Sequence, residues 1–141
     1  MLGIAESLLS GEKSLLRCGG GWINYAIQTD GQIIPCPTMW GIKNQYLGHV
    51  GKSDPMKLGQ VFVTEPCTQC NILDLCGGRC LYANFMKRWS HDAYGLVCKT
   101  VNNLVGAVSQ QMPEIQKLIN EGTVSFKDFE FIRFNGCEII P

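Results

Sequence analysis

The chain has no stretch that approaches the ~20 consecutive apolar residues needed for a membrane-spanning helix. It also has no excess of charge of one sign, since 12 basic and 12 acidic residues give a net charge of zero. No basic tail favours nucleic acid or an anionic membrane surface. The first ten residues lack both the basic region and the long apolar stretch of a secretory signal. We therefore expect a cytoplasmic protein that binds neither membranes nor nucleic acid.

Histidine is also scarce, with only 2 residues in 141, whereas the chain carries 8 cysteines and 16 glycines. The length fits one small domain with a limited hydrophobic core. In a reducing compartment, a high cysteine content favours metal ligation over disulfide bonds. Metal sites can also staple a small core.

The cysteines follow a defined spacing. Cys67-x2-Cys70-x5-Cys76-x3-Cys80-x17-Cys98 forms the main run, with Cys18 and Cys36 upstream and Cys137 near the end. Four thiolates around one centre suit zinc or an iron–sulfur cluster. A zinc ribbon usually shows two C-x2-C knuckles, and this chain has one. The spacing therefore favours an iron–sulfur cluster over zinc but does not exclude zinc.

The secondary structure expected around these cysteines mixes short strands and helices. Asp30-Gly31 predicts a hairpin turn between two β-prone runs, which would bring Cys18 and Cys36 to the same end. The two runs cover 22–27 and 32–36. Residues 37–66 are rich in loop signals, with a short strand or helical turn at 59–64. The tail, 123–140, has β-prone runs around Cys137.

Helices are expected at both ends of this region. Gly11 weakens the middle of a first helix, and a glycine loop at 76–80 opens another. Pro113 should begin a separate helical segment. The predicted helices cover 4–16, 81–89, 95–111 and 114–120.

The full cysteine pattern resembles a known family. Cys18-x12-Gly31-x4-Cys36, followed by the run from Cys67 to Cys98, is similar to the seven-cysteine SPASM pattern. That domain is the C-terminal auxiliary iron–sulfur domain of radical S-adenosylmethionine enzymes that modify peptides or proteins, such as anaerobic sulfatase maturases. The segments 46–50 and 75–80 also look like this family. The resemblance covers roughly residues 18–104.

The resemblance implies two [4Fe–4S] clusters with interleaved ligands. The outer cluster would be bound by Cys67, Cys70, Cys76 and Cys98, and the inner cluster by Cys18, Cys36 and Cys80. Some members supply a fourth inner ligand shortly after the first cysteine, but residues 19–25 contain no cysteine here. The inner cluster would then keep an open iron, or Cys137 would complete it. A buried free thiol is an equally good interpretation of Cys137.

The C-x3-C-x2-C triplet that binds S-adenosylmethionine in this family is missing. The chain alone is therefore not expected to cleave that cofactor, and no catalytic residue is predicted in it. The resemblance implies a radical S-adenosylmethionine barrel in cis or in trans, which would use the cofactor in the full-length enzyme, and a peptide or protein substrate. Whether the chain itself is part of an enzyme stays open. The alternatives are a stand-alone electron-transfer or accessory module and a zinc-binding structural domain.

The resulting expectation is a small α+β domain stapled by iron–sulfur clusters. It has an N-terminal β-hairpin, ligand loops rich in glycine and cysteine, and C-terminal α-helices. Residues 1–17 would be a helix and linker from a preceding barrel, 18–110 the auxiliary cluster domain, and 111–141 a C-terminal helix and tail. Trp22, Tyr25, Trp40 and Trp89 would line a peptide channel or, more commonly for such aromatics, shield the core and clusters.

Overall fold

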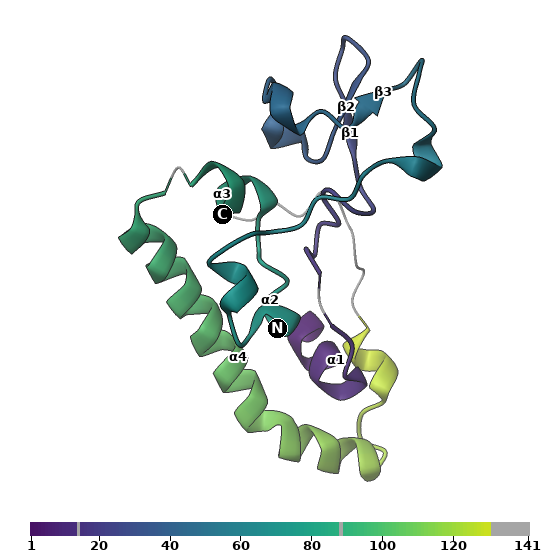
Figure 1. Cartoon of the computed structure of the whole chain (residues 1–141). Coiled ribbons are helices and arrows are strands. Elements are labelled where there is room, and N and C mark those ends of the chain that lie inside the picture. The colour runs from purple at the N-terminus through teal and green to yellow at the C-terminus, as the bar shows by residue number, and fades with distance from the viewer. Residues whose placement is uncertain (14, 88, 131–141) are drawn as a thin grey trace.

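The computed structural model of the chain describes residues 1–13, 15–87 and 89–130. It has the mixed α+β character expected from the sequence (Figure 1). The helices are α1 (Leu2–Ser10), α2 (Leu73–Cys76), α3 (Leu81–Met86) and α4 (His91–Asn120). The strands are β1 (Ala26–Ile27), β2 (Gln32–Ile34) and β3 (Gly48–His49). Short 3-10 turns lie at Pro37–Met39, Lys43–Gln45, Pro55–Lys57, Cys67–Gln69 and Phe126–Phe129.

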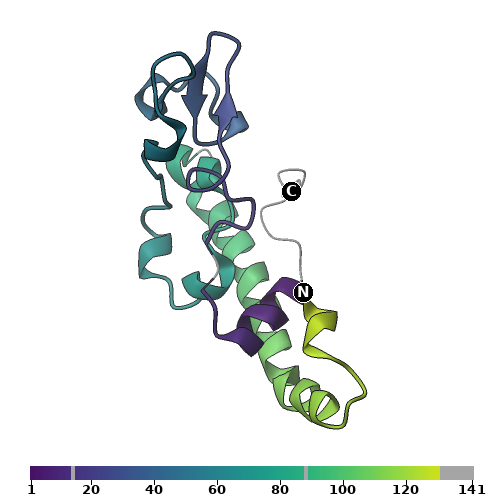
Figure 2. The same ribbon diagram turned by 90° about the vertical axis from the view of Figure 1, so that its right-hand side faces the viewer.

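The sheet and the shorter helices are arranged one after another along the axis of the long helix α4 (Figure 2). The sheet lies beyond one end of this helix, and α1 lies across its other half beside the turn at Phe126–Phe129. The short helices α2 and α3 lie between these ends, where α2 contacts both α1 and α4. The segment that carries most of the cysteines is thus held between the helical end and the sheet.

The predicted hairpin is confirmed. Strands β1 and β2 pair antiparallel, with Ala26 opposite Ile34, and β3 pairs antiparallel with the other edge of β2. Asp30 accepts a hydrogen bond from the Gln32 backbone N–H (3.1 Å), which closes the turn. Both strands are shorter than the β-prone runs. Strand β3 was not predicted, because a two-residue strand with a glycine carries almost no pattern.

Gly31 is required by this turn for two reasons. Its φ is +83°, which disfavours residues that have a Cβ atom. A Cβ at this position would also lie 2.7 Å from Nε2 of His49. The His49 ring is held there because Nε2 bonds the Asp30 carbonyl (3.0 Å) and Nδ1 accepts from the Gly51 N–H (3.0 Å). The turn geometry and the position of His49 therefore both require a glycine between Cys18 and Cys36.

The first helix is shorter than predicted. Gly11 takes a left-handed conformation (φ 71°) and donates its N–H to the Ser7 carbonyl, so α1 ends at Ser10. The prediction of a helix to residue 16 is wrong, because Gly11 acts as a C-terminal cap and does more than weaken the middle.

The prediction of two helices around Pro113 is also wrong. The chain forms one continuous helix, α4, with Pro113 inside it. Proline removes one backbone hydrogen bond, but packing upstream continues to hold the helix. Val101, Val105 and Val108 are buried on one face against Ile4 and Ala5 of α1. This cluster is the main hydrophobic core.

The remaining elements differ less from the predicted secondary structure. Helix α3 begins at Leu81 as predicted but ends at Met86, because Lys87 has a positive φ of 46°. Residues 59–64 form neither a strand nor a helical turn. In the tail, Phe126–Phe129 is a 3-10 turn with a capping box between Ser125 and Asp128. The β-prone runs around Cys137 lie outside the described residues.

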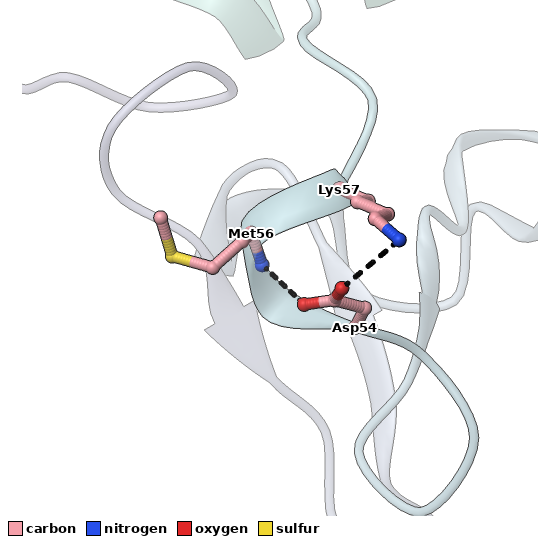
Figure 3. Close-up of polar contacts among 3 residues, drawn as sticks. All are labelled: Asp54, Met56 and Lys57. Carbon is pink, nitrogen blue, oxygen red and sulfur yellow. Dashed lines mark hydrogen bonds and ion pairs between the residues drawn. The ribbon is translucent and has the colours of Figure 1, made fainter.

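The loop between the sheet and the cysteine run is ordered by local polar contacts (Figure 3). The Asp54 carboxylate accepts a hydrogen bond from the Met56 N–H (3.0 Å) and lies 3.6 Å from Nζ of Lys57. This capped turn precedes an extended segment whose Val61 N–H donates to the Gly21 carbonyl (2.7 Å). The extended segment leads directly into the first cysteine knuckle.

Among the described residues, none of the helices combines the length and apolar character required to cross a membrane. The predicted domain boundaries stay predictions. The boundary at 110/111 falls inside α4, and residues of α1 share a core with α4.

Candidate metal centre

Three elements position the cysteines of the main run. Cys67 and Cys70 begin and follow the 3-10 turn Cys67–Gln69, and the Cys70 N–H donates to the Cys67 carbonyl (3.0 Å). Cys76 is the last residue of α2, and Cys98 lies at the start of the third turn of α4. The C-x2-C knuckle, the end of a short helix and a long helix therefore converge from different parts of the chain.

These cysteines line one cavity of about 310 Å³. Its wall contains Cys67, Cys70, Cys76, Cys80 and Cys98, and the rest of the lining is largely apolar, including Ile72, Leu73, Val97 and Val101. Cys67 is buried, Cys70 is exposed, and the other three are half-buried. A partly enclosed cavity lined by soft thiolate donors fits an iron–sulfur cluster or another thiophilic metal group.

The electrostatic environment links the four cysteines of the predicted outer site. Burial raises the pKa of the Cys98 thiol, and the neighbouring Cys67, Cys76 and Cys70 raise it further. Burial also raises the pKa of Cys76, which is affected by Cys67 and Cys70 as well. Like charges within a shared low-dielectric site disfavour ionisation of every member. A bound cation would relieve this repulsion, which is the behaviour of a metal-binding thiol group.

Arg79 partly offsets this accumulation of negative charge. It lowers the pKa of both Cys76 and Cys98, against the larger effect of burial. It lies between Cys76 and Cys80 with a positive φ of 56°. A guanidinium between two cysteines thus offsets part of the negative charge that their thiolates would carry.

Hydrogen-bond donors surround several of the sulfur atoms. The Gly78 N–H donates to Cys76, and the Ala83 N–H lies 3.5 Å from Sγ of Cys80. In the upstream region, Sγ of Cys36 lies 3.0 Å from the Thr38 hydroxyl. Donors directed at cysteine sulfur stabilise thiolates and tune metal sites that these thiolates bind.

Gly77 and Gly78 allow close packing beside the cavity. Both have positive φ angles, 70° and 81°. A Cβ on Gly77 would lie 2.6 Å from the Leu15 carbonyl oxygen, and one on Gly78 would lie 2.7 Å from Val63. The glycine loop thus lets the N-terminal segment and the extended segment pack against the cysteine-bearing turn. Arg17 adds to this connection, because Nη2 donates to the Leu75 carbonyl (2.9 Å).

Cys18 and Cys36 come together at the base of the hairpin, as the turn predicted. A Cβ built on Gly20 would lie 3.5 Å from Sγ of Cys18 and 3.9 Å from Cβ of Cys36. Both cysteines pack against a second buried cluster, which contains Met39 and Leu81. Leu81 directly follows Cys80, the third cysteine predicted for the inner site.

Cys80 itself lines the cavity of the other four cysteines and caps α3. Its assignment to the inner site stays a prediction. Cys137 lies outside the described residues, so the fourth inner ligand is also still a prediction. Within the described part of the chain, no three His, Cys, Asp or Glu side chains are grouped closely enough to hold a single metal ion.

Two residues beside the cavity were missed by the sequence interpretation. The Tyr94 hydroxyl lies 3.0 Å from Sγ of Cys67, and Nδ2 of Asn84 lies 3.6 Å from the same sulfur. Tyr94 lies four residues before the predicted ligand Cys98 on α4, whereas Asn84 lies in α3, after the extended residue Cys80. A spacing of four places two side chains on the same helix face, and this signal could have identified Tyr94 but not Asn84.

The predicted aromatic residues are divided between the two regions. Trp89 lines the cavity and its ring centroid lies 6.1 Å from that of Tyr94. Trp40, in contrast, is 62% exposed and is not part of the core. Trp89 is itself 38% exposed, so the shielding role of these aromatic residues stays a prediction.

Compared with protein-family models, curated proteins and solved structures, the chain shows no significant match to any of them. Its functional interpretation therefore depends on the arrangement of its own residues and on the cysteine spacing.

Proposed function

We propose that the chain is an iron–sulfur domain that binds an outer [4Fe–4S] cluster through Cys67, Cys70, Cys76 and Cys98. A second cluster would be bound by Cys18, Cys36 and Cys80. The domain would act as the auxiliary cluster domain of a radical S-adenosylmethionine enzyme that modifies a peptide or protein. The radical-generating barrel would be supplied in cis or in trans, since the chain has no C-x3-C-x2-C triplet.

One observation carries the proposal for the outer site. Four cysteines spread over 32 positions of the sequence, from Cys67 to Cys98, line a single cavity of about 310 Å³. Three of them, Cys67, Cys70 and Cys76, also raise the pKa of the fourth, Cys98. A structural core of buried free thiols has no need to converge in this way, because neutral thiols gain little from one another.

The surroundings support a redox role over a purely structural one. When bound, an iron–sulfur cluster supplies a one-electron redox centre whose potential depends on burial and on hydrogen bonds to its sulfurs. The chain provides both, through the apolar lining of the cavity and through donors such as the Gly78 N–H. Its residues would hold the centre, restrict water and orient the thiolates, and the centre would accept or relay an electron or anchor the substrate.

Anaerobic purification and reconstitution test the proposal. The chain should hold roughly eight irons and eight inorganic sulfides, with the brown colour and absorption typical of [4Fe–4S] clusters. The variants Cys98→Ser and Cys18→Ser should each lose about half of the iron, since each removes a ligand from a different cluster. In the double variant, iron binding should be almost abolished.

A matched control is Ser109→Ala, which alters an exposed position of α4 away from the cysteines and should leave the iron content unchanged. Stoichiometric zinc without iron after anaerobic purification would contradict the proposal and favour a zinc-binding structural domain. Retention of full iron content in Cys98→Ser would contradict the ligand assignment.

A further inference from the structure

The sulfur of Cys67 is distinguished from the other cysteine sulfurs of the cavity by two side-chain contacts. The Tyr94 hydroxyl lies 3.0 Å from it and Nδ2 of Asn84 lies 3.6 Å from it. We propose that Tyr94 and Asn84 are positioning residues that donate hydrogen bonds to the Cys67 thiolate and raise the reduction potential of the outer site. This inference rests on the proposed function, because it requires a redox centre bound by Cys67.

The orientation of the Asn84 amide is determined by Thr64. Oδ1 of Asn84 accepts from both the Thr64 N–H (2.7 Å) and the Thr64 hydroxyl (3.1 Å). Since a backbone N–H can only donate, the oxygen must face it, and the NH₂ group faces the other way. Nδ2 then donates to the Thr64 carbonyl (3.0 Å) and is directed at Sγ of Cys67. Asn84 is only 1% exposed, so this arrangement is held inside the protein.

The donor role of Tyr94 follows from the state of its partner. A thiol and a hydroxyl could each donate, but a metal-bound thiolate has no proton and can only accept. The hydroxyl of Tyr94 must therefore donate to Cys67 when that cysteine is a ligand. Tyr94 is held in place by α4, one turn before Cys98, and by its ring contact with Trp89.

Two donors on one ligand sulfur have a predictable effect on the redox equilibrium. Reduction adds negative charge to the site, and charge-assisted hydrogen bonds to an anion strengthen as that charge increases. The donors thus stabilise the reduced state more than the oxidised state. Removing one should make the outer site harder to reduce without removing a ligand.

The experiment compares midpoint potentials of the reconstituted full chain, measured by anaerobic titration with electron paramagnetic resonance detection. Tyr94→Phe should retain its iron, and the midpoint potential of its outer cluster should become more negative. We expect a reduction equilibrium constant about threefold smaller, which is about 30 mV for one electron at ~59 mV per tenfold change. Tyr46→Phe is the control, because it removes a hydroxyl that donates to Oε1 of Gln28 (3.4 Å). Among the described residues, no hydrogen bond joins this hydroxyl to a cysteine sulfur.

A fluorinated tyrosine at position 94 provides the opposite perturbation. Its hydroxyl is more acidic and is a stronger donor, so the potential should rise while the shape of the residue is nearly unchanged. It also covers the case in which Tyr94→Phe loses iron, since a purely structural role predicts no shift with the fluorinated residue. Deuterium exchange should in addition remove one more proton coupling to the reduced centre in the wild-type chain than in Tyr94→Phe, because the amide protons of Asn84 exchange in both.

The outcomes separate the two proposals. A wild-type chain that binds no iron overturns the proposed function. A wild-type chain that binds iron, with unchanged potentials in both position-94 variants, overturns the hydrogen-bond proposal alone. Opposite shifts in the two variants support it.

Discussion

The substitution Gly31→Ala tests how the hairpin that carries Cys36 is built. Gly31 combines a φ of +83° with a contact in which an added Cβ would lie 2.7 Å from Nε2 of His49. A left-handed conformation costs a residue with a Cβ about 1–2 kcal/mol relative to glycine. The His49 ring would also have to move and lose its bond to the Asp30 carbonyl, worth about 0.5–1.5 kcal/mol.

Together these costs lower the free energy of unfolding by about 2 kcal/mol. This value is near the low end of the summed range, because the bond to Asp30 is exposed to solvent. For a chain of this length, the thermal midpoint should fall by roughly 4–8 °C. The assay is anaerobic thermal unfolding followed by circular dichroism at one fixed scan rate, because loss of a bound metal group makes such midpoints rate-dependent. Pairing of β1 with β2 should weaken, and loading of the site near Cys36 should fall with it.

Gly41→Ala is the matched control. Gly41 has a similar φ of +75°, but a Cβ there would meet nothing within 4 Å. It should show only the conformational cost, about 1 kcal/mol at the low end of the range used for Gly31. In the double variant with His49→Ala, the extra cost of Gly31→Ala should disappear, since the ring is gone. The reasoning would be refuted if Gly31→Ala cost no more than Gly41→Ala, or if the cycle showed no coupling.

Two further predictions concern adjacent residues of α4 and have opposite signs. Gly106→Ala should raise the free energy of unfolding by about 1 kcal/mol, because alanine is the better helix former and a Cβ at Gly106 would meet nothing within 4 Å. Val105→Ala should lower it by about 2 kcal/mol, because Val105 is buried against α1 and two methyl groups are lost. Thermal unfolding of both variants checks the pair; a neutral Val105→Ala would show that α1 does not pack on α4 as described, and a destabilising Gly106→Ala would contradict the open surroundings of Gly106.

Several local features were predictable because they depend on neighbouring residues. Asp30-Gly31 indicated the hairpin, and the glycine loop at 76–80 indicated the start of α3 at Leu81. The errors arose where tertiary packing competes with a local signal. Pro113 indicates a break, but the helix continues through it, and Gly11 indicates a weak point within a longer helix but is a C-terminal cap.

In the candidate site too, features formed by neighbouring residues were predictable, and contacts between distant residues were not. The C-x2-C knuckle and the glycine loop next to Cys76 were recognisable from sequence because each lies within a few residues. The hydrogen bonds to Cys67 were not, since Asn84 and Tyr94 reach that sulfur from two helices that lie 17 and 27 positions further along the chain. Periodicity places a residue on a helix face, but it does not say which distant sulfur that face meets.

The amino-acid sequence by itself determined the donor chemistry of this protein, since the number, type and spacing of its cysteines are properties of the chain alone. It also determined the turns, because glycine and aspartate act through local backbone geometry. Only the tertiary structure decided which sulfurs share a cavity and which donors face them. The physical reason is that burial, electrostatic coupling and hydrogen bonding depend on distances in space, and folding brings Cys67 and Cys98 together across 31 positions of sequence.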